Sequence, residues 1–127
     1  MSVSMQMPIL IVDDYNTMIR ILRNLLRQLG FSHIDEASDG RTALTKLRAK
    51  DYGLVISDWN MEPMTGMELL RQVRASERYR DTPFLMVAND NGDSLDAARR
   101  AGASSYIVKP FNAQTLKSKL EGVIGAF

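Results

Sequence analysis

Short apolar runs alternate with longer amphipathic stretches along the chain, and this alternation constrains the fold more than any other feature. Most runs have strand length and branched side chains, as expected for strands buried on both faces of a sheet. We expect strands at Ile9–Val12, Ser32–Ala37, Leu54–Ser57, Phe84–Ala88 and Ser105–Val108. Strands that alternate with helices predict an α/β fold: (βα)5, a doubly wound parallel five-stranded sheet with helices on both faces.

Signals for helix ends lie where this pattern needs them. Gly30 and Gly102 follow helical stretches and are plausible stops, and Asn112 has the chemistry of a cap for the last helix. Asp39-Gly40 is a turn or cap before the second helix. The connections are too short for a second domain, and 127 residues is close to the usual size of one domain. We therefore expect residues 1–127 to form a single domain.

The composition excludes several classes of protein. Hydrophobic residues make up 45% of the chain and the net charge is only +1, so we expect a packed core and neither nucleic-acid nor membrane binding. Cysteine is absent and His33 is the one histidine, which argues against a zinc site or a cysteine nucleophile. The start has no secretory pattern, and no run approaches the roughly 18 apolar residues of a membrane span. A cytoplasmic monomer is the expected state.

Charged residues follow three of the expected strands. Asp13 and Asp14 follow the first strand, Asp58 the third and Lys109 the fifth. Parallel strands share one carboxyl end, and open α/β sheets bind ligands in the crevice there. Taken singly, the aspartates are more often caps or solvated loop residues, and Lys109-Pro110 is more often a surface turn. Their joint placement favours a site for a metal, a phosphoryl group or both.

With these residues placed, the chain closely resembles the receiver domain of two-component response regulators, and most closely the single-domain, CheY-like chemotaxis regulators. The resemblance runs from about Pro8 to the C-terminus and implies the strand order 2-1-3-4-5 of flavodoxin-like folds. Its motifs are Ile11–Asp14, Ser57–Met61, Ala101–Ala103 and Tyr106–Phe111.

The resemblance implies a role for each residue of the crevice. Asp58 is the implied phosphoacceptor, with a phosphohistidine of a sensor histidine kinase as donor. Asp14, Asp58 and the backbone carbonyl of Asn60 are implied ligands of Mg²⁺, with Asp13 acting mainly through water. Lys109 is implied to contact the phosphoryl oxygens. Carboxylates about 4 Å apart repel by about 4 kcal/mol at an effective dielectric near 20, and a hard divalent cation offsets this repulsion.

The resemblance also implies how the signal leaves the site. Tyr106 is the expected aromatic switch, and Asn60 and Asp90 occupy positions that tune the rate of dephosphorylation. The expected partners are the sensor kinase, a flagellar motor switch protein or another output protein, and a candidate phosphatase. The implied contact surface covers Ser94–Arg100, Ser104–Val108 and Gln114–Lys119.

One position departs from the family pattern. The fourth strand of receivers usually ends in a threonine or serine whose hydroxyl contacts the phosphoryl group, and this chain has Ala88 there. A hydrogen bond to a charged group contributes about 1.5–3 kcal/mol, so its loss predicts a weaker or rewired coupling between Asp58 and Tyr106. Ordinary strand packing at Ala88 is the alternative.

Four other functions remain open at this stage. The chain could be a single-domain regulator of another pathway or a phosphate sink, which would look the same in sequence. An aspartyl-nucleophile phosphatase normally carries a second aspartate two residues after the nucleophile, where this chain has Asn60. A degenerate receiver that acts as a binding module is favoured only by Ala88. We expect no enzyme activity beyond phosphorylation and dephosphorylation of the protein itself.

Overall fold

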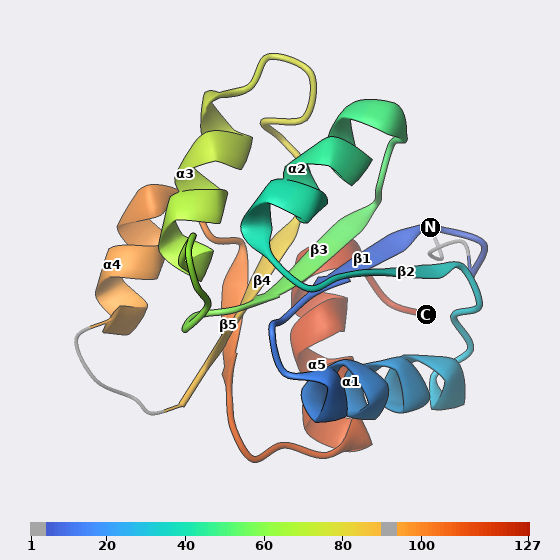
Figure 1. Ribbon diagram of the computed structural model, residues 1–127. Coiled ribbons are helices and arrows are strands. Elements are labelled where there is room, and N and C mark those ends of the chain that lie inside the picture. The colour runs from blue at the N-terminus through green and yellow to red at the C-terminus, as the bar shows by residue number, and fades with distance from the viewer. Residues whose placement is uncertain (1–4, 90–93) are drawn as a thin grey trace.

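The computed structural model describes residues 5–89 and 94–127, in which one parallel sheet forms the centre (Figure 1). Its strands lie in the order β2-β1-β3-β4-β5, and every neighbouring pair is parallel, which confirms the predicted fold. The strands are β1 (Ile9–Val12), β2 (Ile34–Ala37), β3 (Leu54–Asp58), β4 (Phe84–Ala88) and β5 (Ser105–Val108). The helices are α1 (Asn16–Gln28), α2 (Gly40–Ala49), α3 (Gly66–Ala75), α4 (Ser94–Ala101) and α5 (Ala113–Ile124).

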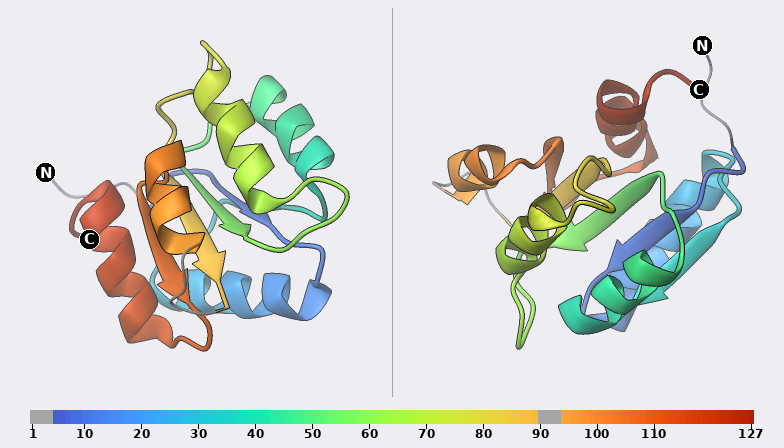
Figure 2. Two further views of the ribbon diagram at one scale, coloured as in Figure 1. Left: turned by 90° about the vertical axis from the view of Figure 1, so that its left-hand side faces the viewer. Right: turned by 90° about the horizontal axis from the view of Figure 1, so that it is seen from above.

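Helices cover both faces of the sheet, with α1 and α5 on one face and α2, α3 and α4 on the other (Figure 2). Two buried apolar clusters fill the two interfaces. The central strands alternate between them: Leu10 and Val12 point into the cluster under α2 and α3, whereas Ile9 and Ile11 point into the cluster under α1 and α5. This two-sided burial explains why the central strands read as continuous apolar runs.

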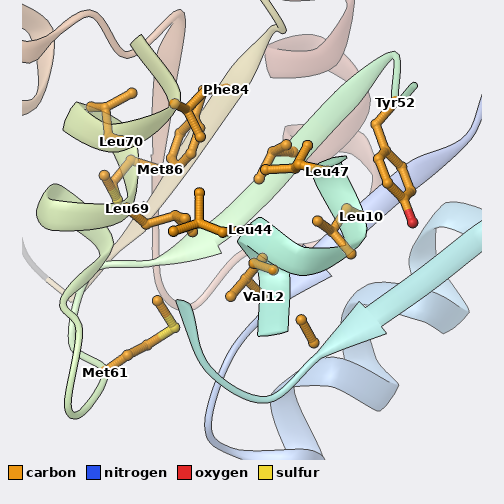
Figure 3. Close-up of a cluster of buried hydrophobic side chains, with 14 of the residues drawn as sticks. Leu10, Val12, Leu44, Leu47, Tyr52, Met61, Leu69, Leu70, Phe84 and Met86 are labelled. Carbon is orange, nitrogen blue, oxygen red and sulfur yellow. The ribbon is translucent and has the colours of Figure 1, made fainter. Parts of the chain in front are cut away.

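The cluster beneath α2 and α3 reaches from the amino ends of the strands to the loop after β3 (Figure 3). Met61, from that loop, is 2% exposed and therefore anchors the loop against the core. The side chains labelled in Figure 3 are Leu10, Val12, Leu44, Leu47, Tyr52, Met61, Leu69, Leu70, Phe84 and Met86.

The predicted helix ends are confirmed. Gly30 and Gly102 follow α1 and α4 with φ of 107° and 104°, a backbone region that favours glycine. The Asn112 side chain accepts a hydrogen bond from the Thr115 N–H at 2.9 Å, and Asp39 accepts one from the Thr42 N–H at 2.7 Å. These side chains satisfy amide groups that have no partner within the helix.

Two predicted strand boundaries were wrong. The second strand starts at Ile34, not at Ser32, because Ser32 and His33 are exposed and precede the ladder of β2 with β1. The third strand continues through Asp58, which stands opposite Val87 of β4. A charged residue therefore ends a fully buried strand. Among the described residues, no helix has both the length and the apolar character that a membrane span requires.

Candidate functional site

The carboxyl ends of β1, β3 and β5 bring the predicted site residues together. Asp13 directly follows β1, Asp58 is the last residue of β3, and Lys109 directly follows β5. The main chain is fixed at each point, since the N–H groups of Asp13, Trp59 and Lys109 donate to carbonyls of an adjacent strand of the sheet at 2.9–3.1 Å. Continuation of the ladder past each strand end thus holds the site in place.

Three carboxylates form a tight cluster at this edge. Asp13, Asp14 and Asp58 each place a carboxylate oxygen within 4.8 Å of the others. Asp13 is 1% and Asp58 6% exposed, whereas Asp14 is exposed. The cluster combines two nearly buried acids with one that faces solvent.

Two buried carboxylate oxygens of the cluster lack a hydrogen-bond partner among the described residues. Asp13 Oδ1 accepts a hydrogen bond from the Tyr15 N–H at 2.9 Å, but the buried Asp13 Oδ2 has no partner among the described residues. Lys109 Nζ lies 3.0 Å from Asp58 Oδ1 and forms an ion pair with it. The buried Asp58 Oδ1 has this ion pair but no hydrogen-bond partner within the described part of the chain.

The electrostatic cost of the cluster is visible at Asp13. Burial raises the pKa of its carboxyl group from 3.8 to about 6, and the charges of Asp58 and Asp14 add to the increase. The Tyr15 N–H and the Lys109 ammonium act in the opposite direction but do not cancel it. The folded protein therefore disfavours the charged form of Asp13, as expected for a buried acid beside other acids.

The cluster fits a divalent hard cation. Buried carboxylate oxygens without a partner are costly, and a cation that contacts them removes both the missing interaction and the mutual repulsion. Mg²⁺ prefers carboxylate and carbonyl oxygens and uses only one or two carboxylates of a site directly. Asp13, Asp14 and Asp58 supply oxygens of this kind.

A cavity of about 410 Å³ opens beside the cluster. Its lining includes Asp14, the exposed Asn60 and the buried Met61. Glu62 and Thr65 complete the wall. The predicted ligand residue Asn60 therefore lines the same cavity as Asp14 of the carboxylate cluster.

Gly66 is a site residue that the sequence interpretation missed. It begins α3, and its N–H donates to the Trp59 carbonyl at 3.0 Å. A Cβ at this position would lie 2.1 Å from the backbone oxygen of Asp58, which is closer than atoms can approach. The loop after β3 closes against Asp58 only with glycine here. In the sequence, the one hint of this constraint is that Thr65-Gly66 follows Asp58 closely.

Ala88 and Tyr106 occupy neighbouring strands. Ala88 is 2% exposed, and it lies opposite Val108, while Met86 lies opposite Tyr106. Side chains alternate along a strand, so Ala88 faces the same side of the sheet as Met86. Met86 belongs to the cluster beneath α2 and α3, and Tyr106 packs against that cluster. Ala88 thus stands between the crevice and Tyr106 and has no hydroxyl to link them. Asp90, predicted to tune the rate, lies outside the described residues.

The chain is similar to a known protein family and to several of its characterised members. Residues 9–121 match the family model of the response regulator receiver domain. The chain is 52% identical over 118 residues to the chemotaxis protein CheY of Pseudomonas aeruginosa, covering 92% of this chain and 95% of that protein. It is 49% identical to the chemotaxis protein CheY-3 of Vibrio cholerae, covering 92% of this chain and 91% of that protein.

Solved structures give the same result. The chemotaxis response regulator CheY4 of Vibrio cholerae superposes with a TM-score of 0.84 at 33% identity, over 91% of this chain and 97% of that one. The receiver domain of a Pseudomonas aeruginosa sensor histidine kinase superposes with a TM-score of 0.81 at 26% identity, over 95% of this chain and 99% of that one. That structure is described as having a magnesium ion coordinated in the active site cleft.

The chain belongs to the response regulator receiver domain family. It is a two-component response regulator whose relatives include CheY proteins at about 50% identity over most of its length.

Proposed function

We propose that Asp58 accepts a phosphoryl group from a phosphohistidine of a sensor kinase, with Mg²⁺ held by the carboxylate cluster. The proposal rests mainly on one arrangement: a nearly buried carboxylate flanked by two further acids on one side and by the Lys109 ammonium at 3.0 Å on the other. Asp14, Asp58 and the Asn60 carbonyl would hold the ion, and Asp13 would contact it mainly through water.

Each group of the crevice has a distinct task in the transfer. A carboxylate oxygen of Asp58 attacks phosphorus and forms an acyl phosphate, while the bond from phosphorus to the donor nitrogen breaks and its electron pair stays on the donor. Lys109 exchanges its contact with Asp58 for one with a phosphoryl oxygen and so stabilises the transferred charge. When bound by Asp14, Asp58 and the Asn60 carbonyl, Mg²⁺ would supply further neutralisation of that charge.

The output is a protein contact, and chemotaxis is the favoured pathway. The support comes from relatives named as chemotaxis proteins at 52% and 49% identity. The surface formed by α4, β5 and α5, which lie side by side in Figure 2, would contact a flagellar motor switch protein. A phosphatase would act at the crevice.

Treatment with acetyl phosphate and Mg²⁺, followed by intact-mass analysis, tests this function. We expect the mass of one phosphoryl group to be added to the parent protein and none to Asp58→Asn, which keeps the shape of the side chain but lacks the nucleophilic charge. Asp51→Asn, at an exposed aspartate outside the cluster, is the matched control and retains the adduct. An adduct that survives Asp58→Asn would contradict the assignment.

The reaction should stop after one modification of the protein itself. An aspartyl-nucleophile phosphatase would instead turn over a generic phosphate ester, and the position at which it carries a second acid is Asn60 here. Continuous release of phosphate from p-nitrophenyl phosphate, lost in Asp58→Asn, would favour the phosphatase.

Restoring a hydroxyl at position 88 should strengthen the switch. We expect Ala88→Thr to enlarge the change in the Tyr106 environment on phosphorylation, because a hydrogen bond to a charged group contributes about 1.5–3 kcal/mol and a full switch needs about 5.5 kcal/mol. NMR of the Tyr106 side chain with and without acetyl phosphate measures the change. Ala88→Val, which adds the same bulk without a donor, is the control. Equal changes in the parent and Ala88→Thr would contradict the expectation.

A further inference from the structure

We propose that Lys119 is a positioning residue that holds the ring of Tyr106 in its present orientation through a cation–π contact. The inference rests on the proposed role of Tyr106 as the switch and adds a second residue that controls it. Lys119 lies on α5 and Tyr106 on β5, so the contact joins two elements of the proposed output surface.

The contact is close and has no competitor among the described residues. Lys119 Nζ lies 4.6 Å from the centroid of the Tyr106 ring, well within the range of about 6 Å in which a cation is attracted to an aromatic face. No carboxylate within the described part of the chain forms an ion pair with Lys119. The lysine is half-buried, which limits screening of its charge by water.

The Tyr106 ring also packs against the cluster beneath α2 and α3, but nothing in the described part of the chain holds its hydroxyl. Its hydroxyl makes no hydrogen bond to any group of residues 5–89 and 94–127. The ring borders a cavity of about 190 Å³, whose other lining residues include Ala98 and Ala103 of small volume. On the side of the crevice, Ala88 offers only a methyl group. Its packing leaves free volume on one side and, among the described residues, no partner for the hydroxyl, so the contact with Lys119 opposes a reorientation that the packing alone permits.

The size of this effect can be stated as a ratio of orientations. A cation–π contact near a surface contributes about 0.5–1 kcal/mol. Removing the cation should therefore lower the population of the present Tyr106 orientation, relative to all other orientations, by about two- to five-fold. Lys119→Met removes the charge and keeps most of the side-chain volume. Lys119→Arg keeps a cation that can stack on the ring and should restore the parent behaviour.

The test uses fluorine NMR of the unphosphorylated full chain with 3-fluorotyrosine in place of its 4 tyrosines. Tyr106→Phe identifies the Tyr106 signal. Lys117→Met is the matched control, because Lys117 lies on the same helix and its Nζ is 5.8 Å from the ring of Phe127, not of Tyr106. We expect Lys119→Met to shift the Tyr106 signal, and Lys119→Arg and Lys117→Met to leave it in place.

An unchanged Tyr106 signal in Lys119→Met, or an equal change in Lys117→Met, would overturn the proposal. Adduct formation with acetyl phosphate is measured on the same samples and should be the same in all variants, since Lys119 is outside the carboxylate crevice. Absence of an adduct in the parent protein would refute the proposed function but would not produce the difference between Lys119→Met and Lys117→Met. The two failures are therefore distinguishable.

Discussion

Replacement of Asp13 by asparagine is expected to make the metal-free protein more stable, by about 3 kcal/mol at about pH 8. The pKa of Asp13 is about 6 in the folded protein, against an ordinary value of 3.8. As the pH rises from about 4 to about 6, the unfolded chain gives up this proton while the folded protein retains it, so the free energy of unfolding decreases. Asparagine cannot ionise and keeps an oxygen acceptor for the Tyr15 N–H.

Urea unfolding in the presence of a chelator, followed by the fluorescence of the single tryptophan Trp59, measures this effect. The stability difference between Asp13→Asn and the parent should be small near pH 4, grow up to about pH 6 and then stay constant. Added Mg²⁺ should stabilise the parent more than the variant. A variant that is less stable than the parent at about pH 8 without metal would contradict the account.

Asp35→Asn is the control of opposite sign. The Tyr52 hydroxyl donates to Asp35 Oδ2 at 2.6 Å and Lys50 lies 3.1 Å away, so these groups lower the pKa of Asp35. The stability that the charged form of Asp35 contributes is present above its ordinary pKa and is lost as the pH falls. Asp35→Asn should therefore be less stable than the parent at about pH 8, and the difference should shrink in acid.

Loss of the Arg74 guanidinium is expected to destabilise the protein by about 2–4 kcal/mol, since hydrogen bonds to charged groups contribute about 1.5–3 kcal/mol each and are not additive. The guanidinium donates to the carbonyls of Arg80 and Thr82 at 2.7 Å and to that of Gly102 at 2.9 Å. It therefore connects α3 to the loop before β4 and to the turn after α4. Arg74→Met leaves these carbonyls without their charged donor.

The same urea measurement tests this expectation. Arg71→Met is the matched control, because Arg71 lies on the same helix, is exposed and should change stability by no more than about 0.5 kcal/mol. Arg74→Lys should fall between the parent and Arg74→Met, since one ammonium cannot reproduce the planar fork of the guanidinium. Equal effects of Arg74→Met and Arg71→Met would show that the three contacts contribute nothing to stability.

The fold was accessible from sequence because its signals are local. Strands buried on both faces must be apolar along their whole length, and Ile9–Val12 and Phe84–Ala88 show this directly. The edge strand β2 was predicted too long because its exposed start has no such constraint. The third strand was predicted to end at Ser57, because the apolar pattern of the sequence stops before Asp58. The backbone pairing of β3 with β4 continues through Asp58.

The site was only partly accessible. The topology of parallel strands predicts that Asp13, Asp58 and Lys109 meet, and the ion pair at 3.0 Å agrees with that prediction. The roles of Arg74 and Lys119 could not be predicted, because their partners are carbonyl groups and a ring brought near only by the tertiary fold. Gly66 was missed for a similar reason: the constraint on it comes from the Asp58 backbone oxygen, not from its own turn.

A crystal structure with Mg²⁺ and beryllofluoride, a mimic of the phosphoryl group, tests the central claim most directly. We expect beryllium bonded to a carboxylate oxygen of Asp58, the cation in contact with the carboxylate cluster, and Lys109 Nζ within hydrogen-bond distance of a fluoride. Beryllofluoride bound to another carboxylate, or a cation bound away from Asp13, Asp14 and Asp58, would contradict the account.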